Sequence, residues 1–414
     1  MTENFANENA PTRISVGELR LGEEDRKAIL EVIDSNRISE GNKTANFERE
    51  WAKFVGTKYC VAVNSGTSAL ITGLLSLKYL KEKPIGKCTK VITAPITYIA
   101  TSNALVNSGF EPVYVDVDPD TFCITPENIR AHMETVRDPQ EHSIILPVHV
   151  MGYMCDMDEI NKIAKEYDLV TFEDAAQAHG SEYKDRKAGS LSLLSDFSFY
   201  IAHNIQAGEL GTINTNDSEI ARLARKIKAN GRLCDCPICT RRTKGCPKIK
   251  SRSSEEDVDP RFTHDIIGFN FKTMEFQTAI ASVQLKRIKE IIRKRQENVK
   301  YLNDGLERYS KIIKLPKYDK NVSYLAYPLV INDTKIASRQ KLRARLEKKG
   351  IESRPLFGCI PTQQPAYKHL KSKYSGRLPV AENLGSNGFY IGCHQYLTND
   401  ELDYIIDVFG GLLR

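Results

Sequence analysis

Residues 169–180 read Leu-Val-Thr-Phe-Glu-Asp-Ala-Ala-Gln-Ala-His-Gly, and this stretch decides the fold. An apolar run ends in two carboxylates and continues into a turn of small residues. This pattern is typical of a buried strand followed by a turn. Ligands of open α/β sheets bind beyond the carboxyl ends of the strands, so Asp174 lies where a site is expected. An aspartate that caps the next helix is the alternative interpretation.

Six similar runs accompany this strand, and helical patterns separate them. Because the runs are mostly apolar, they predict strands that are buried on both faces, as in a mainly parallel sheet. The sequence therefore predicts an α/β fold with a seven-stranded sheet. The predicted strands are residues 60–63, 90–93, 112–115, 143–148, 170–173, 197–201 and 211–214, and the predicted helices are residues 16–35, 45–55, 68–79, 100–107, 158–166 and 219–230.

The order of these patterns divides the chain into three parts. Residues 1–15 are predicted to form an N-terminal arm, and residues 16–285 a large domain with a Cys-rich insertion at 231–260. Residues 286–414 are predicted to form a small α+β domain. A long helix is expected at 275–309, across the boundary between the two domains. It is followed by an expected strand at 325–331 and expected helices at 342–349 and 401–409.

The composition is that of a soluble globular protein. Of 414 residues, 41% are hydrophobic and 27% are charged, which excludes a disordered or collagen-like chain. No apolar run approaches the ~20 residues of a membrane helix, and residues 1–17 lack the pattern of a secretory signal. We therefore expect a cytoplasmic protein without a membrane segment. The net charge of +6, from 59 basic and 53 acidic residues, is too small to indicate nucleic-acid binding.

Two further stretches carry small and polar residues beside predicted strands. Residues 64–68, Asn-Ser-Gly-Thr-Ser, follow a strand and open a helix, so their backbone amides can approach a phosphate. Strand-to-helix turns need small residues in any case, so this stretch alone also fits a purely structural turn. Residues 196–211 read Asp-Phe-Ser-Phe-Tyr-Ile-Ala-His-Asn-Ile-Gln-Ala-Gly-Glu-Leu-Gly and lead into the last predicted strand of the sheet.

Together with Pro-Ile-Thr-Tyr-Ile-Ala-Thr at 95–101 and Gly-Phe-Asn-Phe-Lys at 268–272, these stretches resemble the sugar aminotransferases of the DegT/DnrJ/EryC1/StrS family. The resemblance runs from about residue 38 to the C-terminus, in the family's order and spacing. It implies the pyridoxal-phosphate (PLP)-dependent fold type I, as in aspartate aminotransferase. It also implies an enzyme that acts on a nucleotide-linked sugar with pyridoxal or pyridoxamine 5′-phosphate.

The resemblance implies which residues hold the phosphate of this cofactor. Ser65, Gly66 and Thr67 would bind it through their amides and hydroxyl groups, together with Ser198. Asn270 would reach the phosphate held by the other subunit. The resemblance therefore implies a homodimer.

The resemblance also implies contacts to the cofactor ring. Asp174 would pair with the protonated pyridine nitrogen, which the chemistry needs because a positive ring accepts the electrons of a carbanion. Gln177 would lie beside the phenolic oxygen. Tyr98 would stack on the ring.

One position departs from the aminotransferases. The residue before Asn204 is the Schiff-base lysine in those enzymes, but here it is His203, and no lysine lies between Lys187 and Lys226. A neutral imidazole does not form a stable imine, but it moves protons near neutral pH. The same substitution marks the 3-dehydratases, or lyases, of nucleotide-linked 4-keto-6-deoxy sugars in pathways such as those to ascarylose and colitose. The resemblance therefore implies a dehydratase that holds pyridoxamine phosphate non-covalently.

In this interpretation the cofactor amine condenses with the C4 ketone of the sugar, His203 acts as the base, and the C3 hydroxyl leaves. Two alternatives remain open from the sequence. An aminotransferase would use a lysine from elsewhere in the chain. A protein that binds cofactor or zinc without turnover is the second alternative.

Four of the ten cysteines, Cys234, Cys236, Cys239 and Cys246, fall within thirteen residues. In a reducing cytoplasm such a group more often binds a metal than forms disulfides. The segment is similar to one in the ascarylose-pathway dehydrase, which implies an iron–sulfur cluster of the [2Fe–2S] type and a reductase or ferredoxin-type electron donor. The match is incomplete, because this chain has Ala176 where that enzyme has its first ligand. A zinc ion bound by the four thiolates is the alternative.

In the predicted small domain, residues 352–359 and 388–395 resemble segments that line the sugar site of these dehydratases. Arg354 is a candidate contact to the nucleotide diphosphate, because its guanidinium fork matches phosphate oxygens. His394 is a candidate substrate contact. A surface arginine and a hydrogen-bonded structural histidine are the corresponding alternatives.

Overall fold

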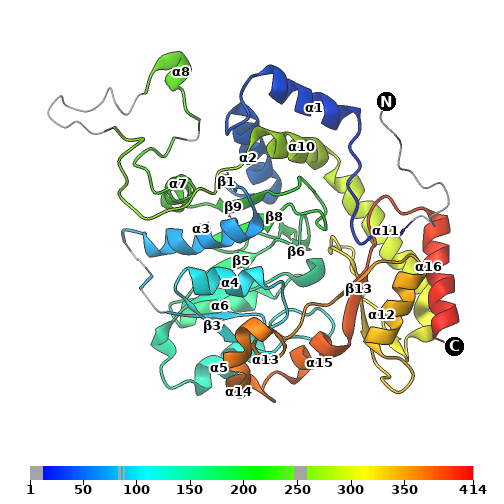
Figure 1. The fold of residues 1–414 in the computed structure, drawn as a ribbon. Helices are drawn as coiled ribbons and strands as arrows, with labels where there is room; N and C mark the ends of the chain where they lie inside the picture. The colour runs from blue at the N-terminus through cyan, green and yellow to red at the C-terminus, as the bar shows by residue number, and fades with distance from the viewer. Residues whose placement is uncertain (1–12, 83–84, 87–88, 237, 247–258, 414) are drawn as a thin grey trace.

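The computed structural model describes residues 13–82, 85–86, 89–236, 238–246 and 259–413 (Figure 1). The N-terminal arm predicted at 1–15 therefore lies almost entirely outside the described residues, as does the second half of the Cys-rich insertion. A seven-stranded sheet and a four-stranded sheet organise the described part of the chain.

The seven-stranded sheet contains the strands that the sequence predicts. Its members are β1 (Tyr59–Val63), β2 (Lys90–Thr93), β3 (Glu111–Tyr114), β4 (His142–Leu146), β5 (Val170–Asp174), β8 (Leu194–Ser198) and β9 (Gly211–Thr215). The strand order is β1-β9-β8-β5-β4-β2-β3, and β9 runs antiparallel to both of its neighbours. The other neighbours pair in parallel, so the predicted mainly parallel seven-stranded sheet is confirmed.

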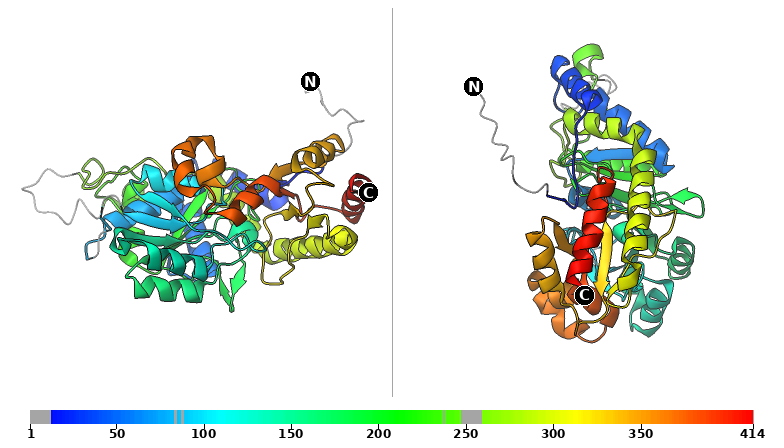
Figure 2. Two further views of the ribbon diagram at one scale, coloured as in Figure 1. Left: turned by 90° about the horizontal axis from the view of Figure 1, so that it is seen from below. Right: turned by 90° about the vertical axis from the view of Figure 1, so that its right-hand side faces the viewer.

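Helices connect the strands and cover the sheet. α3 (Gly66–Lys78) packs beside α4 (Ala100–Asn107) and α7 (Ser218–Ile227), and α5 (Pro126–Thr135) packs beside α6 (Met157–Glu166). Figure 2 shows the sheet between these helical layers. Among the helices of the described residues, none combines the length and the apolar character needed to cross a membrane.

β8 begins and ends three residues earlier than predicted. The pattern predicts a strand at 197–201, whereas the strand spans Leu194–Ser198. Its ladder with β5 ends at Asp196, and its ladder with β9 ends at Ser198. The chain then leaves the sheet in a loop that turns back at Gly208, whose φ of 76° suits a glycine. His203 lies on this loop.

The first predicted helix is shorter than its pattern. The sequence predicts a helix over 16–35, but α1 begins later and spans Glu23–Asp34. Residues 13–22 are not helical, and Gly17 lies against the backbone of the loop after β8. A Cβ atom on Gly17 would come within 2.7 Å of the Ile201 carbonyl oxygen, so the close approach needs glycine.

The long helix predicted at 275–309 is interrupted. It is divided into α10 (Glu275–Lys286) and α11 (Ile288–Leu306), which meet at Arg287. The Arg287 guanidinium donates a hydrogen bond at 2.9 Å to the buried carboxylate of Asp25 in α1. The break therefore coincides with a contact that joins three helices, and helical periodicity alone contains no signal for it.

A four-stranded antiparallel sheet forms the C-terminal part, in the order β10-β11-β13-β12. Together with its helices it is the small α+β unit predicted after α10, and it lies to the right in Figure 1. Its elements are β10 (Ile313–Lys314), β11 (Tyr327–Ile331), β12 (Ser353–Pro355), β13 (Gly388–Ile391), α12 (Arg339–Lys348), α13 (Ile360–Gln363), α14 (Lys371–Tyr374), α15 (Pro379–Asn387) and α16 (Asn399–Leu412). Short elements elsewhere are β6 (Glu182–Tyr183), β7 (Arg186–Lys187) and α8 (Arg241–Lys244).

An aromatic cluster fixes the carboxyl end of β8. Trp51 of α2 (Asn42–Val55) is fully buried, and its ring meets the rings of Phe197 and Phe199 edge to face at 5.0 and 4.9 Å. Edge-to-face pairs at this separation are favourable beyond the apolar area they bury. The cluster therefore anchors the point at which the chain leaves the sheet toward His203.

α2 begins three residues before the predicted 45–55 helix because a distant carboxylate caps it. Gly41 stands at the N-cap and has no side chain to offer. Glu275 of α10 instead accepts hydrogen bonds from the backbone N–H groups of Gly41, Lys43 and Thr44, each at 2.8 Å. The first N–H groups of a helix have no partner within it, so the buried Glu275 supplies what the local sequence lacks.

The substitution Glu275→Ala should lower the free energy of unfolding by about 1.5–3 kcal/mol, because it removes a charged acceptor from buried donors. Urea unfolding followed by circular dichroism measures the change. The matched control is Glu290→Ala in α11, where the carboxylate is 65% exposed, and the unfolding midpoint should not move. Equal midpoints for the two variants would contradict the capping role of Glu275.

Candidate functional site

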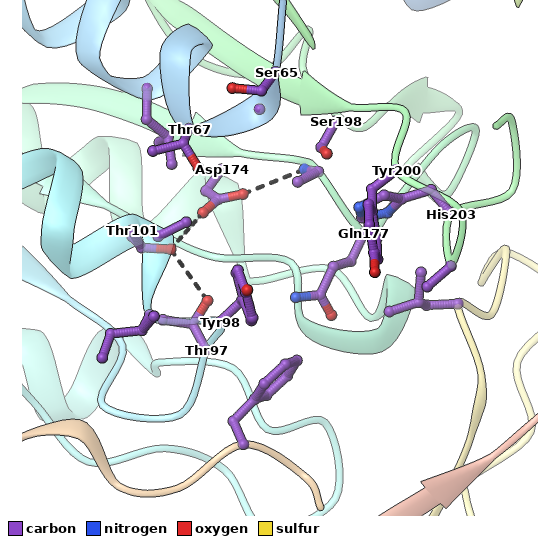
Figure 3. A pocket seen from close by; sticks show the side chains of 18 of the residues that line it. Ser65, Thr67, Thr97, Tyr98, Thr101, Asp174, Gln177, Ser198, Tyr200 and His203 are labelled. Carbon is purple, nitrogen blue, oxygen red and sulfur yellow. Dashed lines mark hydrogen bonds between the residues drawn. The ribbon is translucent and has the colours of Figure 1, made fainter. Parts of the chain in front are cut away.

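A cavity of about 640 Å³ lies at the carboxyl ends of the parallel strands (Figure 3). Four strand ends of the large sheet contribute to it, through the β1–α3 junction, the loop after β2, the end of β5 and the loop after β8. The small sheet supplies one further wall. The residues that line the cavity include Ser65, Gly66, Thr67, Thr97, Tyr98, Thr101, Asp174, Gln177, Asp196, Ser198, Tyr200, His203, Glu209, Arg354, Phe357 and Tyr390.

The β1–α3 junction forms a cradle that fits a phosphate group. Ser65 caps α3 by accepting the Ser68 N–H at 3.1 Å, and the amides of Gly66 and Thr67 begin the helix. A Cβ atom on Gly66 would come within 2.5 Å of the Ser198 side chain, so only glycine brings the two backbones this close. Free N–H groups at the positive end of a 13-residue helix are a suitable site for an anion.

Asp174 ends β5 and faces the cavity (Figure 3). Its carboxylate accepts a hydrogen bond from the Thr101 hydroxyl at 2.8 Å and a longer one from the Ala176 N–H at 3.3 Å. Thr101 in turn contacts the hydroxyl of Thr97 at 3.2 Å. Burial raises the pKa of Asp174, and these hydrogen bonds oppose the rise. A cationic ring nitrogen would find a buried counter-charge here, which fits the predicted cofactor.

His203 lies on the loop after β8, with 9% of its surface exposed. Its Nδ1 is buried without a hydrogen-bond partner, and its ring stacks on that of His179 with centroids 5.6 Å apart. Burial, followed by the positive charge of the buried Arg295, lowers the pKa of His203 to about 3. The imidazole is therefore neutral near pH 7. No lysine is among the residues that line the cavity within the described ranges.

Three further predicted residues line the cavity. The Tyr98 side chain is 64% exposed, and its ring lies 6.4 Å from that of Phe357. The Gln177 side-chain oxygen accepts the Met151 N–H at 2.9 Å, which orients the amide. Arg354 of β12 also lines the cavity and pairs with Glu352 at 2.9 Å.

The other two predicted residues lie away from the cavity of this chain. Asn270 is exposed, and its side chain accepts a hydrogen bond from Lys272. His394 is 1% exposed, neither ring nitrogen has a hydrogen-bond partner among the described residues, and Glu18 lies 4.0 Å away. His394 is not among the residues that line the cavity, so its contact with the substrate stays a prediction.

Several residues that line the cavity were not assigned a role from the sequence. One of them is Asp196, which lies two residues before the predicted Ser198 on β8, and this spacing already places both on one face of a strand. Sequence patterns contain no comparable signal for the loop residues. Those are Tyr200, Glu209 and Phe357, together with Thr97 and Thr101.

The Cys-rich segment does not form the metal site expected from its sequence. Hydrogen bonds join the Leu233 and Cys234 amides to residues 260–263, which fixes the start of the segment. Cys239 is exposed, and Cys234, Cys236 and Cys246 are partly buried. No three His, Cys, Asp or Glu side chains are arranged to hold a metal ion anywhere in the described part of the chain. The four cysteines thus do not fit an iron–sulfur cluster or a zinc ion in this arrangement.

Known proteins match this chain over nearly its whole length. The chain is 32% identical to the GDP-perosamine synthase of Caulobacter vibrioides over 95% of this chain and 96% of that protein. It is 31% identical to the dTDP-4-dehydro-2,6-dideoxy-D-glucose 3-dehydratase of Saccharopolyspora spinosa, over 94% of this chain and 84% of that protein. The crystal structure of an Escherichia coli GDP-4-keto-6-deoxy-D-mannose-3-dehydratase with bound hydrated PLP superposes with a TM-score of 0.82, at 27% identity, over 98% of this chain and 100% of that one.

These likenesses bear out the predicted fold. The neighbouring structures have the PLP-dependent, aminotransferase-like fold, and two of the matching enzymes act on nucleotide-linked sugars, as their names state. Residues 19–409 match the family as a whole. The chain belongs to the DegT/DnrJ/EryC1/StrS aminotransferase family.

Proposed function

We propose that the protein is a pyridoxamine-phosphate-dependent 3-dehydratase of a nucleotide-linked 4-keto-6-deoxy sugar. The observation that carries this proposal is His203, a neutral imidazole in a cavity without a lining lysine among the described residues. An enzyme of this kind keeps its cofactor by non-covalent contacts alone. Likeness to dehydratases that act on GDP- and dTDP-linked sugars supports the substrate class.

The bound cofactor supplies an amine that condenses with a ketone and a ring that accepts electrons. The chain's own residues would hold and orient it. Ser65, Gly66, Thr67 and Ser198 bind the phosphate at the start of α3, and Asp174 provides the counter-charge for the ring nitrogen. His203 would accept a proton on one of its own imidazole nitrogens, because its low pKa keeps the imidazole unprotonated near pH 7.

The remaining walls suit the sugar and its diphosphate. Tyr98 and Gln177 would contact the ring of the cofactor, and Arg354 of β12 would meet the phosphates that extend toward the small sheet. Arg354 is held by Glu352, which leaves the rest of its guanidinium fork for phosphate oxygens. The proposal includes no iron–sulfur step and no electron donor, because the cysteines are not arranged as a metal site among the described residues.

An aminotransferase is the second candidate, and the likeness to GDP-perosamine synthase favours it. That reaction ends with the amine on the sugar rather than with loss of its hydroxyl. A lysine that holds the cofactor covalently would be trapped by borohydride and found by mass spectrometry of the peptides. Such an adduct on the wild-type protein would decide for the aminotransferase.

The substitution His203→Lys tests the base directly. We expect it to bind pyridoxal phosphate covalently, visible as a borohydride-stable adduct, and to lose the dehydration reaction by at least about 10²-fold, a typical contribution of a general base. Dehydration is measured as loss of one water from the 4-keto sugar nucleotide by mass spectrometry. His203→Asn is the control, which should lose dehydration without gaining the adduct. Wild-type rates in both variants would exclude His203 as the base.

The substitution Asp174→Ala should weaken binding of pyridoxamine 5′-phosphate by roughly 10- to 100-fold. This range corresponds to the loss of a hydrogen bond to a charged group, about 1.5–3 kcal/mol. Fluorescence titration of the full chain measures the affinity. Asp185→Asn, on an exposed turn outside the cavity, is the control. An unchanged affinity in Asp174→Ala would leave the aspartate with a structural role only.

A homodimer completes the proposal, with Asn270 reaching the cofactor phosphate of the other subunit. Large apolar side chains are exposed on the same segment, at Phe262, Ile267, Phe269 and Met274. Contiguous exposed apolar side chains indicate an interaction surface. We expect light scattering after gel filtration to give the mass of two chains. Ile267→Asp, which is 77% exposed in one chain, should shift the mass toward one chain, and a monomeric wild-type protein would contradict the dimer.

A further inference from the structure

A second carboxyl group lies beside Asp174. Asp174 of β5 and Asp196 of β8 are partners in the parallel ladder between the two strands. Side chains of partner residues on neighbouring strands point to the same face of a sheet. Both residues line the cavity at the carboxyl ends of the strands. The fold thus presents two carboxyl groups, not one, to whatever binds between β5 and the helix α3.

Asp196 differs from Asp174 in its surroundings. Asp174 receives hydrogen bonds from Thr101 and Ala176. Asp196 is completely buried, and neither of its carboxyl oxygens has a hydrogen-bond partner among the described residues. Charged groups are almost never buried without a partner, because removing their water costs several kcal/mol. An unpartnered buried carboxyl in a ligand cavity therefore indicates a group that is neutral, or that awaits a ligand.

The groups around Asp196 offer it no positive charge. Its ladder partner on the other side is Ile213 of β9, which is apolar. α3 packs on β8, and the titratable residue of that helix, Lys78, lies at the helix's far end. The titratable residues that share the cavity with the pair are Tyr98, Tyr200, His203, Glu209, Arg354 and Tyr390, and Arg354 is already paired with Glu352.

Two carboxyl groups in one buried site do not both ionise readily. Burial raises the pKa of Asp196, and the negative charge of Asp174 raises it further. Burial also raises the pKa of Asp174, but its two donors stabilise the charged form. The second charge would have to be placed next to the first without a counter-ion, which is the situation that keeps one member of a carboxyl pair protonated.

We propose that Asp174 and Asp196 act as one carboxyl pair that shares a single proton and that together binds the protonated ring nitrogen of the cofactor. Asp174 is the charged member, and Asp196 carries the proton. When the pH rises, Asp196 can release its proton next to the cationic ring, which then faces two negative charges instead of one. Asp196 is thus a positioning residue that keeps the ring nitrogen protonated at higher pH. The inference rests on cofactor binding in this cavity, but not on dehydration.

The sign of the pH effect follows from linkage. A carboxyl group whose pKa is raised by folding binds more protons in the folded than in the unfolded state, so its contribution to stability is lost as the pH rises. Protein without cofactor should therefore lose stability as the pH rises above the ordinary pKa of an aspartate, about 4, toward the raised pKa of Asp196. Bound cofactor compensates the second charge, so its stabilising effect should grow over the same range.

The test compares the wild-type full chain with Asp196→Asn, with and without pyridoxamine 5′-phosphate. We expect both proteins to bind this probe with affinities within about twofold of each other at the acidic end of a pH series, because the raised pKa favours the neutral form of Asp196 there. At pH 9 the wild type should bind at least about tenfold more tightly than the variant, the ratio that one pKa unit corresponds to. Without the probe, the melting temperature of Asp196→Asn should fall less with pH than that of the wild type.

Parallel pH profiles for the two proteins, in affinity and in melting temperature, would overturn the pair. An equal loss of affinity in Asp196→Asn at every pH would overturn it too, because a merely structural role predicts that result. If Asp196→Asn does not fold, Asp174→Asn serves in its place. This variant leaves Asp196 without the neighbouring charge that raises its pKa. The fall in melting temperature should therefore end at a lower pH than in the wild type. A fall at the wild-type pH would overturn the proposal. Normal probe binding with no dehydration would instead contradict the proposed function and leave the pair intact.

Discussion

The site depends on the position of β8 between β5 and β9. The parallel ladder to β5 sets Asp196 beside Asp174, and the antiparallel ladder to β9 sets Ser198 opposite Gly211. Gly211 in turn lies so close to the Ser65 carbonyl that a Cβ atom would approach to 2.2 Å. One strand therefore fixes the spacing between the end of the cavity that fits a phosphate and the end that fits a cationic ring.

Burial at this strand also determines which charges the cavity carries before a ligand enters. Water is removed from Asp174, Asp196 and His203 together, which shifts the pKa of each toward its neutral form, and only Asp174 has hydrogen bonds that oppose this shift. The cavity thereby avoids unpaired charges that its surroundings could not compensate. In a ligand with an anionic phosphate and a cationic ring, the phosphate would meet the hydrogen-bond donors at one end of the cavity. The ring would meet the carboxyl groups at the other end. The charges of such a ligand are thus complementary to the groups of the cavity.

The sequence predicted the sheet well because its strands are short apolar runs with clear ends. It also singled out several polar residues of the cavity, since Ser65, Asp174 and Ser198 lie in motifs at strand ends. What it missed depends on contacts between distant segments. The start of α2 depends on Glu275, the break at Arg287 depends on Asp25, and the end of β8 depends on two ladders at once. Local periodicity contains none of this information.

The four cysteines show the opposite case, a local pattern whose predicted metal site does not appear among the described residues. Their spacing is a local pattern, and local patterns predict a metal site only if the backbone brings the thiols to one point. In the described residues the segment instead runs along 260–263, with Cys239 exposed. His394 follows β13, but its ring is buried and lies 4.0 Å from Glu18, so its predicted substrate contact stays a prediction. Proximity in sequence to a site residue does not determine the direction of a side chain.

The choice between amino transfer and elimination depends on far fewer residues than the fold. A GDP-perosamine synthase and a sugar 3-dehydratase match this chain almost equally well, at 32% and 31% identity, so overall similarity reports the scaffold rather than the reaction. The residue before Asn204 is different in kind, because it decides whether the cofactor is held covalently. Asn204 is fully buried, and its side chain donates a hydrogen bond at 2.8 Å to the Ser323 carbonyl just before β11. The loop that carries His203 is therefore anchored to the C-terminal part of the chain as well as to β8, and any movement of that part relative to the large sheet would move His203 with it.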